Sequence, residues 1–459
     1  MKPYPEYKDS GVQWLDKLPA TWSISRGKGI FRVIDIRSAT GDEELLTVSS
    51  SDGVVPRSQK TVTMFMAESY VGHKLCWPGD LVINSLWAWM QGLGFARHHG
   101  LVSSAYSVYR PKTAYTEYWR FFHYLLRSAA YKWELQTRSK GVWLSRLQLS
   151  DAAFLDMPIV IPPIEDVLAI VRYIDHANWR IDRYIRAKRK LIALLKEQKQ
   201  AIIQQAVTHG LEPNVRLKPS GVEWLGDVPE HWERRRLKTV LTPVDQRSST
   251  GKETLLSLRR DHGIVIFADH FTRPPQGATM IGFKIVEIGQ IVVNRLQANN
   301  GLIFRSSLRG LVSPDYSVFD AKSPIDMEYL ATLLRTALYR AHFRRESTGL
   351  GTGTAGFLRL YDDRLLETIV WLPPLQEQSQ ILASIDSEAQ EIIRLVERAQ
   401  LEIDLIREYR TRLIADVVTG KIDVRETAQQ LPAETIEPEM LDEEGEDIET
   451  KELETVAED

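Results

Sequence analysis

Gly351-Thr352-Gly353-Thr354-Ala355-Gly356 matches the spacing of the G-x-G-x-x-G loop that holds a dinucleotide pyrophosphate. That motif works between a strand and a helix, whereas the run before it, residues 342–348, is polar. His98 and His99 are adjacent, so they cannot share one helix face as a pair of zinc ligands does. The glycines therefore indicate a loop, and the histidines beside Arg97 indicate a surface or polyanion contact.

Other signatures of catalysis are missing from the sequence. It has no phosphate loop with Gly-Lys-Ser/Thr, no Asn/Asp-Pro-Pro-Tyr/Phe methyltransferase motif and no recognisable nucleophile–base set. Cys76 is the only cysteine, which excludes an intrachain disulfide and is compatible with a reducing compartment. The chain is therefore interpreted as a binding and assembly subunit without catalytic residues, cofactor or metal.

The sequence contains an internal repeat. Ser10-Gly11-Val12-Gln13-Trp14-Leu15 returns 210 positions later as Ser220-Gly221-Val222-Glu223-Trp224-Leu225. Gly100-Leu101-Val102-Ser103 returns in the same way, and from Pro162-Pro163 onward the shift is 211. A fixed period along a whole chain indicates duplicated units, and at this length each unit is a domain. A duplicated protein suits a two-part target.

Each unit begins with a head of mixed strands and helices, predicted at residues 1–161 (head 1) and 211–372 (head 2). Strands are expected where branched or alternating apolar residues follow turn signals, at 79–84, 106–109 and 157–161 and again at 289–294, 316–319 and 369–372. Helices are expected at 118–133 and 329–344. The fold class is α+β, with two tandem heads.

A long helix is predicted after each head, at residues 162–210 and 373–425. Neither has an internal proline or glycine until Thr208 and Thr419. Apolar residues recur every seven positions, with Lys188 interrupting the first series: Ile174, Ile181, Leu195 and Ile202, then Ile385, Ile392, Ala399, Ile406 and Leu413. About 45 residues make a rod of roughly 65–70 Å. The corresponding seams predict an antiparallel coiled coil between the two helices, giving a dumbbell with a pseudo-two-fold axis.

Charge is divided unevenly along the chain. Residues 426–459 carry 14 Asp or Glu and one Lys, whereas residues 1–425 carry 57 Lys or Arg and 47 Asp or Glu. A basic body with an acidic tail is compatible with a polyanion partner, although ordinary surface charge explains the same numbers. The tail is predicted to be disordered. Without a signal peptide or an apolar run of roughly 18 residues, the chain is expected to be cytoplasmic, with no membrane partner.

The duplicated pattern resembles the specificity subunit of type I restriction-modification systems. Four features carry the resemblance: the Ser-Gly-Val-x-Trp-Leu…Pro…Trp opening of each unit, Gly-Leu-Val-Ser-x-x-Tyr-Ser-Val, the Leu372–Gln378 start of the second long helix, and Val418-Thr419-Gly420 at its end. The first long helix departs from this pattern, with Ile164-Glu165-Asp166 at its start. The acidic tail lies outside the resemblance, which covers residues 7 to about 425.

The resemblance implies both fold and function. Two target-recognition domains would each read one half of a bipartite, asymmetric site in double-stranded DNA, and the helices would set the gap. The family's partners are two methyltransferase subunits, which carry S-adenosylmethionine and flip adenine, and two restriction/motor subunits that use ATP and Mg²⁺. This chain would perform no chemistry itself.

Base readout needs side chains that can make paired hydrogen bonds to base edges. In head 1 the candidates are Arg138 and Lys140 of the basic loop Arg138-Ser139-Lys140-Gly141, Gln91, and Arg97 beside the histidines. Trp87 and Trp89 suit a wedge or a stacking surface, but their i, i+2 spacing on a strand favours one face of the core.

In head 2 the run Arg295-Leu296-Gln297-Ala298-Asn299-Asn300 follows a strand and is rich in base-reading residue types. The loop Thr348 to Gly353, preceded by Arg344 and Arg345, matches the basic loop of head 1. Arg259 and Arg260 replace Ser50 and Ser51 of head 1, as residues that read a different half-site would. For each arginine or lysine, a solvated surface role stays open.

Two other classes of function compete with DNA specificity. One is a coiled-coil adaptor that joins protein partners without DNA. Binding to DNA should weaken steeply with salt, whereas contacts through apolar seams should not. The other is a stand-alone enzyme, which the missing motifs disfavour.

Overall fold

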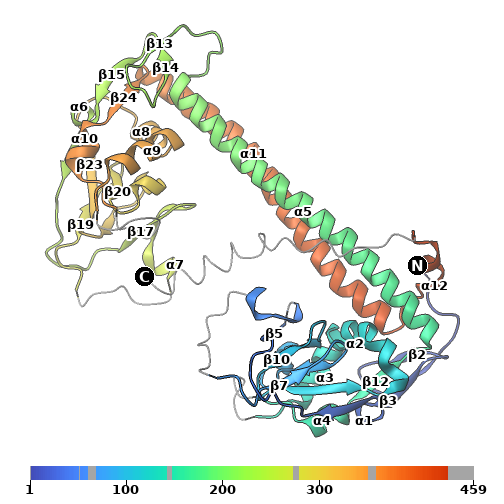
Figure 1. Cartoon of the computed structure of the whole chain (residues 1–459). Helices are drawn as coiled ribbons and strands as arrows, with labels where there is room; N and C mark the ends of the chain where they lie inside the picture. Colours follow the sequence, from blue (N-terminus) through green and yellow to red (C-terminus); the bar gives the residue numbers. More distant parts are fainter. Residues whose placement is uncertain are drawn as a thin grey trace. The chain divides into compact units, whose positions relative to one another are not determined.

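The computed structural model describes residues 2–50, 52–59, 69–141, 147–271, 279–349 and 358–432. The chain divides into two compact units, one formed by residues 1–187 and 401–459 and the other by residues 188–400. Each unit contains one head and one end of each long helix (Figure 1).

Head 1 is built on a four-stranded antiparallel sheet in the order β4-β11-β8-β9. Two-stranded ribbons β1-β2, β3-β12, β5-β6 and β7-β10 surround it. Its strands are β1 Tyr7–Asp9, β2 Lys17–Pro19, β3 Ser23–Arg26, β4 Phe31–Ile34, β5 Leu46–Ser49, β6 Gly53–Pro56, β7 Lys74–Cys76, β8 Leu81–Ile83, β9 Leu93–Phe95, β10 Gly100–Val102, β11 Ser107–Pro111 and β12 Pro158–Ile161. Its helices are α1 Gly27–Ile30, η1 Arg57–Gln59, η2 Ala88–Met90, η3 Thr113–Tyr118, α2 Trp119–Leu126, α3 Ala129–Arg138 and α4 Asp151–Leu155.

Head 2 repeats this plan with the sheet β16-β23-β20-β21 and the ribbons β13-β14, β15-β24, β17-β18 and β19-β22. Its strands are β13 Leu217–Pro219, β14 Asp227–Pro229, β15 Glu233–Arg236, β16 Leu241–Val244, β17 Leu256–Arg259, β18 Gly263–Ile266, β19 Lys284–Val286, β20 Ile291–Asn294, β21 Ile303–Arg305, β22 Gly310–Val312, β23 Tyr316–Ala321 and β24 Ile369–Leu372. Its helices are α6 Leu237–Val240, α7 Phe267–His270, η5 Ala298–Asn300, α8 Met327–Leu334, α9 Ala337–Glu346 and α10 Asp362–Glu367. The predicted α+β heads are confirmed.

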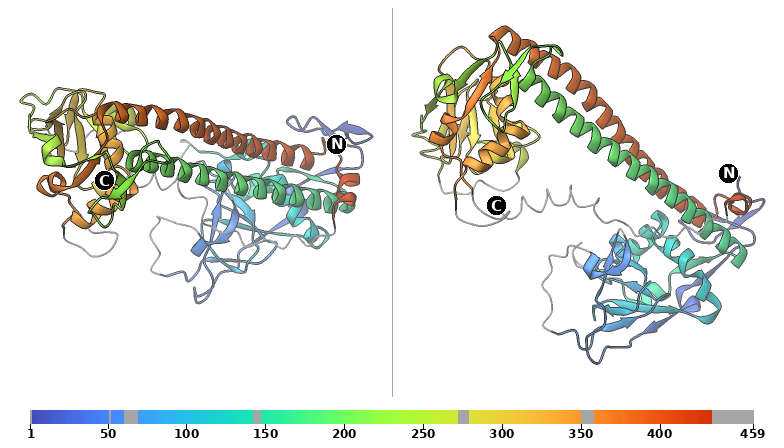
Figure 2. Two further views of the ribbon diagram at one scale, coloured as in Figure 1. Left: turned by 90° about the horizontal axis from the view of Figure 1, so that it is seen from above. Right: turned by 45° about the horizontal axis from the view of Figure 1, so that its top comes forward.

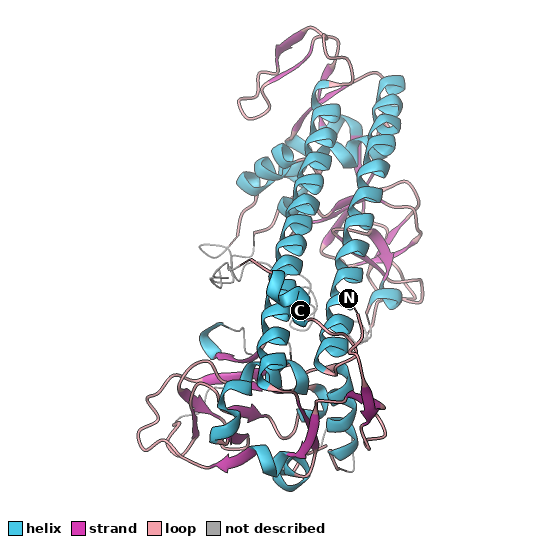
Figure 3. Ribbon diagram, turned by 90° about the vertical axis from the view of Figure 1, so that its right-hand side faces the viewer, coloured by secondary structure: helices cyan, strands magenta, loops and turns pink. Residues whose placement is uncertain are grey.

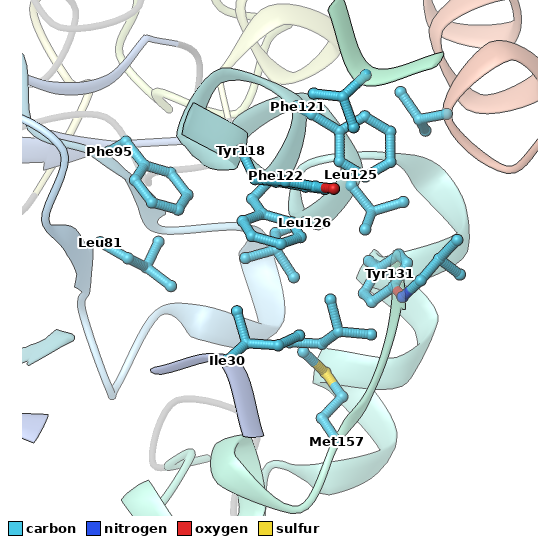
Figure 4. Packing of buried hydrophobic residues seen from close by; sticks show 14 of the residues in the cluster. Ile30, Leu81, Phe95, Tyr118, Phe121, Phe122, Leu125, Leu126, Tyr131 and Met157 are labelled. Atoms are coloured by element: carbon cyan, nitrogen blue, oxygen red, sulfur yellow. The ribbon is translucent and has the colours of Figure 1, made fainter. Parts of the chain in front are cut away.

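Each sheet has a hydrophobic cluster on each of its two faces. Successive side chains of a strand point to opposite sides, so one strand contributes to both clusters. In β8, Leu81 and Ile83 join the main core of head 1, whereas Val82 joins a second cluster under the β5-β6 and β7-β10 ribbons. Figure 4 shows the main core, where Phe122 and Leu126 of α2 lie near Leu81. Head 2 divides its β20 side chains between two clusters in the same way.

The helices predicted at 118–133 and 329–344 are each broken in two. The breaks fall at Arg127-Ser128, between α2 and α3, and at Arg335-Thr336, between α8 and α9. The Ser128 hydroxyl donates to the Leu125 carbonyl at 2.7 Å, and the Thr336 hydroxyl donates to the Leu333 carbonyl at 2.8 Å. Such local bonds compete with a continuous helix, and a periodicity argument does not detect them.

The long helices are α5, Ile164–His209, and α11, Leu375–Val418. In one unit the start of α5 packs with the end of α11, since Val167, Ile170 and Ile174 share a core with Leu413 and Val417. In the other unit the opposite ends meet, as Ala206 and Val207 share a core with Ile381 and Ile385. The helices therefore pair antiparallel, as predicted, and they run side by side in Figures 2 and 3. The second helix stops at Val418, short of the predicted residue 425.

The repeated opening sequence packs against the ends of the long helices. The Trp22 indole N–H donates to the Asp166 carboxylate in the first turn of α5 at 2.7 Å, and the Trp232 indole N–H donates to the Glu377 carboxylate in α11 at 3.1 Å. Gly420, at φ 76°, lies against Pro19 and Trp22, where a Cβ would come within 2.6 Å of the Pro19 ring. Asp166 thus supplies in α5 the carboxylate that Glu377 supplies in α11, despite the different starting sequence.

The segment after α11 is only partly as predicted. Residues 425–430 form α12, Arg425–Gln430, with Ala428 buried, so the prediction of disorder from residue 426 is wrong for residues 426–430. The remaining tail, residues 433–459, lies outside the described residues, as does the Gly351–Gly356 motif. Of the helices in the described ranges, none combines the length and apolarity needed for a membrane span.

Candidate nucleic-acid interface

Two loops lie together at one end of the sheet in each head. In head 1 the loop from β8 to β9, residues 84–92, meets the loop after α3 where the Leu149 N–H donates to the Ser85 carbonyl at 3.0 Å. In head 2 the Leu360 N–H donates to the Arg295 carbonyl at 2.9 Å. The second loop is closed at its base by an antiparallel bridge in each head, Lys140 with Gln148 and Thr348 with Arg359. The fold thus brings together, in each head, two loops that were predicted separately to contain base-reading residues.

The exposed Trp87 and the half-buried Trp89 form an aromatic platform in the first loop of head 1. Trp87 immediately precedes the short helix η2, Trp89 lies within it, and their rings stack with centroids 6.2 Å apart and planes inclined by 14°. The Trp87 side chain is 56% exposed, and of the three residues only Ala88 between them is buried. The interpretation as one core face is wrong, because the residues lie on a turn and not on a strand.

Gln91 anchors this loop to the break between α2 and α3. It adopts a left-handed conformation at φ 61°, which costs a non-glycine residue about 1–2 kcal/mol. Its side-chain amide donates to the carbonyls of Arg127 at 2.6 Å and Ser128 at 3.2 Å. At the matching position of head 2, Gly301 adopts φ 84° without strain. Gln91 therefore holds the loop in shape, whether or not it also contacts a ligand.

The basic loop of head 1 begins later than predicted. Arg138 is the last residue of α3, and its guanidinium donates to the Glu134 carboxylate and lies 3.7 Å from that of Asp156. The side chain of Arg138 is thus engaged within the head. Lys140 is exposed at the base of the loop. Residues 142–146 of this loop lie outside the described residues.

The matching loop of head 2 presents amides instead of aromatic rings. The Asn300 side-chain N–H donates to the Gln297 side-chain carbonyl at 2.6 Å, and the side-chain N–H groups of the exposed Gln297 form no hydrogen bond with the described residues. The Asn299 side chain is half-buried and forms no hydrogen bond with the described residues. The side chain of Arg295 is engaged within head 2, since its Nε donates to the Asp315 carbonyl at 2.5 Å.

Three further arginines were predicted as base readers in head 2. Arg259 ends β17 with its guanidinium 5.1 Å from the Phe271 ring centroid. Arg344 and Arg345 are exposed in the last turn of α9, just before the bridge at Thr348. The loop between Leu350 and Gly353 lies outside the described residues.

A half-buried arginine at each helix break was not predicted. The guanidinium of Arg127 donates to the carbonyls of Leu93 at 2.6 Å and Ser50 at 2.7 Å, which ties the β5-β6 hairpin to the sheet. Burial lowers the pKa of Arg127, and it lowers that of Arg335, its counterpart in head 2. Arg335 lies 4.8 Å from the Phe304 ring centroid. The only indication in the sequence was an arginine followed by a hydroxyl residue at the same place in both repeats, Arg127-Ser128 and Arg335-Thr336.

A cleft of about 1330 Å³ opens between head 1 and the first half of α5. Seven basic side chains line it, and they come from separate parts of the chain: Arg32, Arg97, Arg110, Lys112, Arg120, Arg172 and Arg186. Arg97 was the only one of these predicted to contact a ligand. Arg172, Asp175, Trp179, Asp182 and Arg186 recur every three or four residues, so they form one face of α5.

Carboxylates in the cleft balance part of this charge. Asp80 binds Arg110 through two hydrogen bonds of 2.7 Å, which raise the pKa of the guanidinium. Asp175 pairs with Arg120 at 2.6 Å, while its burial raises its pKa. Among the described residues, four cleft cations form no ion pair: Arg32, Arg97, Lys112 and Arg172. The cleft is therefore suited to an anionic ligand.

The described residues give no sign of a reactive centre. They include no cluster of three or more His, Cys, Asp or Glu side chains that could hold a metal ion. Cys76 is buried under the sheet, and burial raises the pKa of its thiol to about 12. A thiol with such a pKa stays protonated and unreactive at neutral pH.

No protein-family model matches the sequence, and no curated protein matches it. Solved structures do resemble it. A chain from a study of complex assembly and conformational transition of the type I restriction-modification system is 15% identical, with a TM-score of 0.57 over 88% of this chain and 99% of that chain. The HsdS subunit of Thermoanaerobacter tengcongensis is 16% identical, with a TM-score of 0.49 over 88% and 98% of the two chains.

The type I restriction-modification S subunit of M. genitalium is 10% identical, with a TM-score of 0.32 over 91% of this chain and 99% of that chain. The first of these chains, with a TM-score of 0.57, matches this chain over both of its heads and both of its long helices. The chain therefore has the fold of the specificity subunits of type I restriction-modification systems.

Proposed function

We propose that this chain is the DNA sequence-specificity subunit of a type I restriction-modification complex. Each head binds one half of a bipartite, asymmetric target in double-stranded DNA, and the long helices set the gap between the halves. The chain is a non-catalytic, cytoplasmic subunit. Methyl transfer, with S-adenosylmethionine, and DNA cleavage, with ATP and Mg²⁺, belong to its partner subunits.

One observation carries this proposal: the heads share a buried frame but differ at the same exposed loop. The frame repeats Gly79 as Gly289 and the buried β8 as the buried β20. On that frame head 1 presents Trp87 and Trp89, whereas head 2 presents Gln297, Asn299 and Asn300. Amides read base edges by hydrogen bonding, and aromatic rings stack on bases or wedge between them. Two different readers on one frame are what an asymmetric target requires.

The long helices offer a surface for the partner subunits. Leu401, Leu405 and Tyr409 lie on one face of α11 and are 59%, 56% and 47% exposed. Large apolar side chains at four-residue intervals form a stripe, and exposed apolar patches mark sites of protein interaction. We assign this stripe to the docking of a methyltransferase subunit.

The decisive experiment is a base-resolution methylation map. This chain would be expressed with its neighbouring methyltransferase in a host that does not methylate its DNA, and plasmid DNA would be sequenced for modified adenine. The expected result is a two-part motif with a fixed gap of roughly 5–8 base pairs, so that the half-site centres lie about one helical turn apart.

The matched control is the methyltransferase without this chain, which should leave the plasmid unmodified. A stable complex of the two proteins with no new methylation would contradict the proposal and favour a protein adaptor. Methyl transfer by this chain alone would make it an enzyme.

A further inference from the structure

The described chain ends at the mouth of the basic cleft of head 1. After α12, the guanidinium of Arg172 donates to the carbonyls of Leu431 at 2.7 Å and Pro432 at 3.2 Å. Arg172 also lines the cleft. Leu431 and Pro432, which directly precede the acidic segment of residues 433–459, therefore lie next to the cleft.

The path to this point is held by packing and by charge. Val424 and Ala428 are buried, and Val424 belongs to the main core of head 1. Arg425 pairs with Asp423 at 2.7 Å and lies 3.7 Å from the carboxylate of Asp166 at the start of α5. The exit point of the acidic segment is thus set by the fold of the same unit that contains the cleft.

The acidic segment complements the cleft in charge. Residues 433–459 contain 13 Asp or Glu and one Lys, including five carboxylates within Asp442-Glu443-Glu444-Gly445-Glu446-Asp447. The cleft has seven basic side chains against Asp80, Asp175 and Asp182. Asp182 is neutralised by Arg410 from α11, so it adds little negative charge to the cleft.

The segment is also long enough to enter the cleft. Its 27 residues reach at most about 90 Å when extended, and the first acidic run begins ten residues after Pro432. Because the segment is tethered at the cleft mouth, its effective concentration there is on the order of 1 mM.

We propose that the acidic C-terminal segment, residues 433–459, binds in this basic cleft of the same chain, with its carboxylates on Arg32, Arg97, Lys112 and Arg172. The segment would then compete with other polyanions for the cleft. That consequence for DNA rests on the proposed function, whereas the binding of the segment does not.

A carbodiimide cross-link tests the binding without DNA. The reagent joins carboxylates to amines that are in direct contact, and Lys112 is the cleft amine. In the full-length chain at low salt, mass spectrometry should find Lys112 joined to Asp or Glu of residues 433–459. An Arg172→Lys variant adds a second amine, which should cross-link to the same segment.

Lys140, an exposed lysine of the same head outside the cleft, is the matched control. Cross-links of the segment to Lys112 should exceed those to Lys140 by about tenfold at low salt and should fall as salt screens the charges. They should also be lost when Asp442, Glu443, Glu444, Glu446 and Asp447 are replaced by their amides. Equal cross-linking to Lys112 and Lys140 would overturn the proposal.

DNA affinity tests the competition in the same pair of full-length chains. If the segment binds the cleft with a Kd of about 0.1 mM, as weak polyanion contacts do, its tethering raises the apparent Kd for DNA by about tenfold. The chain with the five amides should therefore bind DNA about tenfold more tightly at low salt. Equal affinities would contradict the competition. A failure of both chains to bind DNA would contradict the proposed function and leave the cross-linking test unaffected.

Discussion

At the scale of single residues, the repeated tryptophans matter through their indole N–H groups. Trp22 donates to Asp166, whose side chain is buried, whereas Trp232 donates to Glu377, which is partly exposed and also contacts His231 at 2.7 Å. We expect Trp22→Phe to cost about 3 kcal/mol, because it removes the hydrogen-bond donor of a buried carboxylate, which then keeps only Arg425 at 3.7 Å. The measurement is the midpoint of thermal unfolding of the intact chain.

Trp232→Phe is the matched control, since it removes the same indole from the equivalent site of the other repeat. Water and His231 can still satisfy Glu377, so the expected cost is smaller, about 1 kcal/mol. Equal shifts of the midpoint in the two variants would show that lost packing volume, and not the hydrogen bond, determines the effect.

His123 gives head 1 a sensitivity to acid. Its Nδ1 accepts the Phe95 N–H at 3.4 Å, and burial, with Arg127, Arg97 and Arg120 nearby, lowers its pKa to about 3. Because the folded pKa lies below the unfolded value of about 6.5, this neutral histidine stabilises the fold fully above pH 6.5. The stabilisation is lost as the pH falls from 6.5 toward 3. At pH 5 the loss is about 2 kcal/mol.

A His123→Gln variant tests this prediction, because glutamine does not titrate. Between pH 7.5 and pH 5 the free energy of unfolding should fall by about 2 kcal/mol less in the variant than in the unmodified chain. His98→Gln, which makes the same substitution at an exposed histidine of the same head, is the matched control. An unchanged pH dependence in His123→Gln would mean that the ring binds a proton as readily in the folded chain as in the unfolded chain, and it would contradict the prediction.

At the scale of elements, periodicity predicted the long helices because a seven-residue repeat survives any local detail. Ile174, Ile181, Ile385 and Ile392 are all buried as expected. The shorter helices and the turns depend on local hydrogen bonds, which periodicity does not detect. The helix breaks at Ser128 and Thr336 depend on single hydroxyl bonds, and the turn at η2 carries Trp87 and Trp89 outward, although their spacing suggests a strand.

The basic cleft could not be found from a local motif. Arg32, Arg97, Lys112 and Arg172 come from four distant parts of the sequence, and only the folded chain brings them together. One signal was present in the sequence. Four charged residues of α5, at 172, 175, 182 and 186, and Trp179 follow the helical period on a face other than the apolar seam, which marks a second contact face.

The two faces of α11 should respond differently to the same substitution. Ile403 is 1% exposed in the seam between the helices, whereas Leu405 is 56% exposed. Ile403→Asp places a charge in the apolar seam and should lower stability by about 3 kcal/mol or more. Leu405→Asp should change stability by no more than about 0.5 kcal/mol. Thermal unfolding of the two variants measures the difference.

Leu405→Asp should instead weaken the complex with the methyltransferase subunit, because it interrupts the exposed apolar stripe. We expect at least a tenfold rise in Kd, as for a residue at the centre of an interface. Binding by titration calorimetry measures it, and Lys421→Asp, outside the stripe, serves as the control. Unchanged affinity for Leu405→Asp would place the partner elsewhere on the chain.

At the scale of the whole molecule, duplication lets the two heads diverge independently. The frame of each head is fixed by its own buried core and by its own tryptophan–carboxylate bond to a long helix. The exposed loops are free of these constraints, so one loop can carry aromatic rings while the other carries amides. A change in one loop should therefore alter one half of the target and leave the other half unchanged.

Trp87→Ala and Asn299→Ala test this independence, and each variant is the control for the other. Trp87→Ala removes a ring that stacks on a base or wedges between bases, which should cost about 1–3 kcal/mol, or roughly tenfold to a hundredfold in affinity, at the head 1 half-site only. Asn299→Ala should relax the base preference at one position of the head 2 half-site. The methylation maps of the two variants should thus differ from the unmodified map in opposite halves of the motif. If either substitution changed both halves, the heads would be coupled through the DNA or through the paired helices, and the modular reading of the repeat would be wrong.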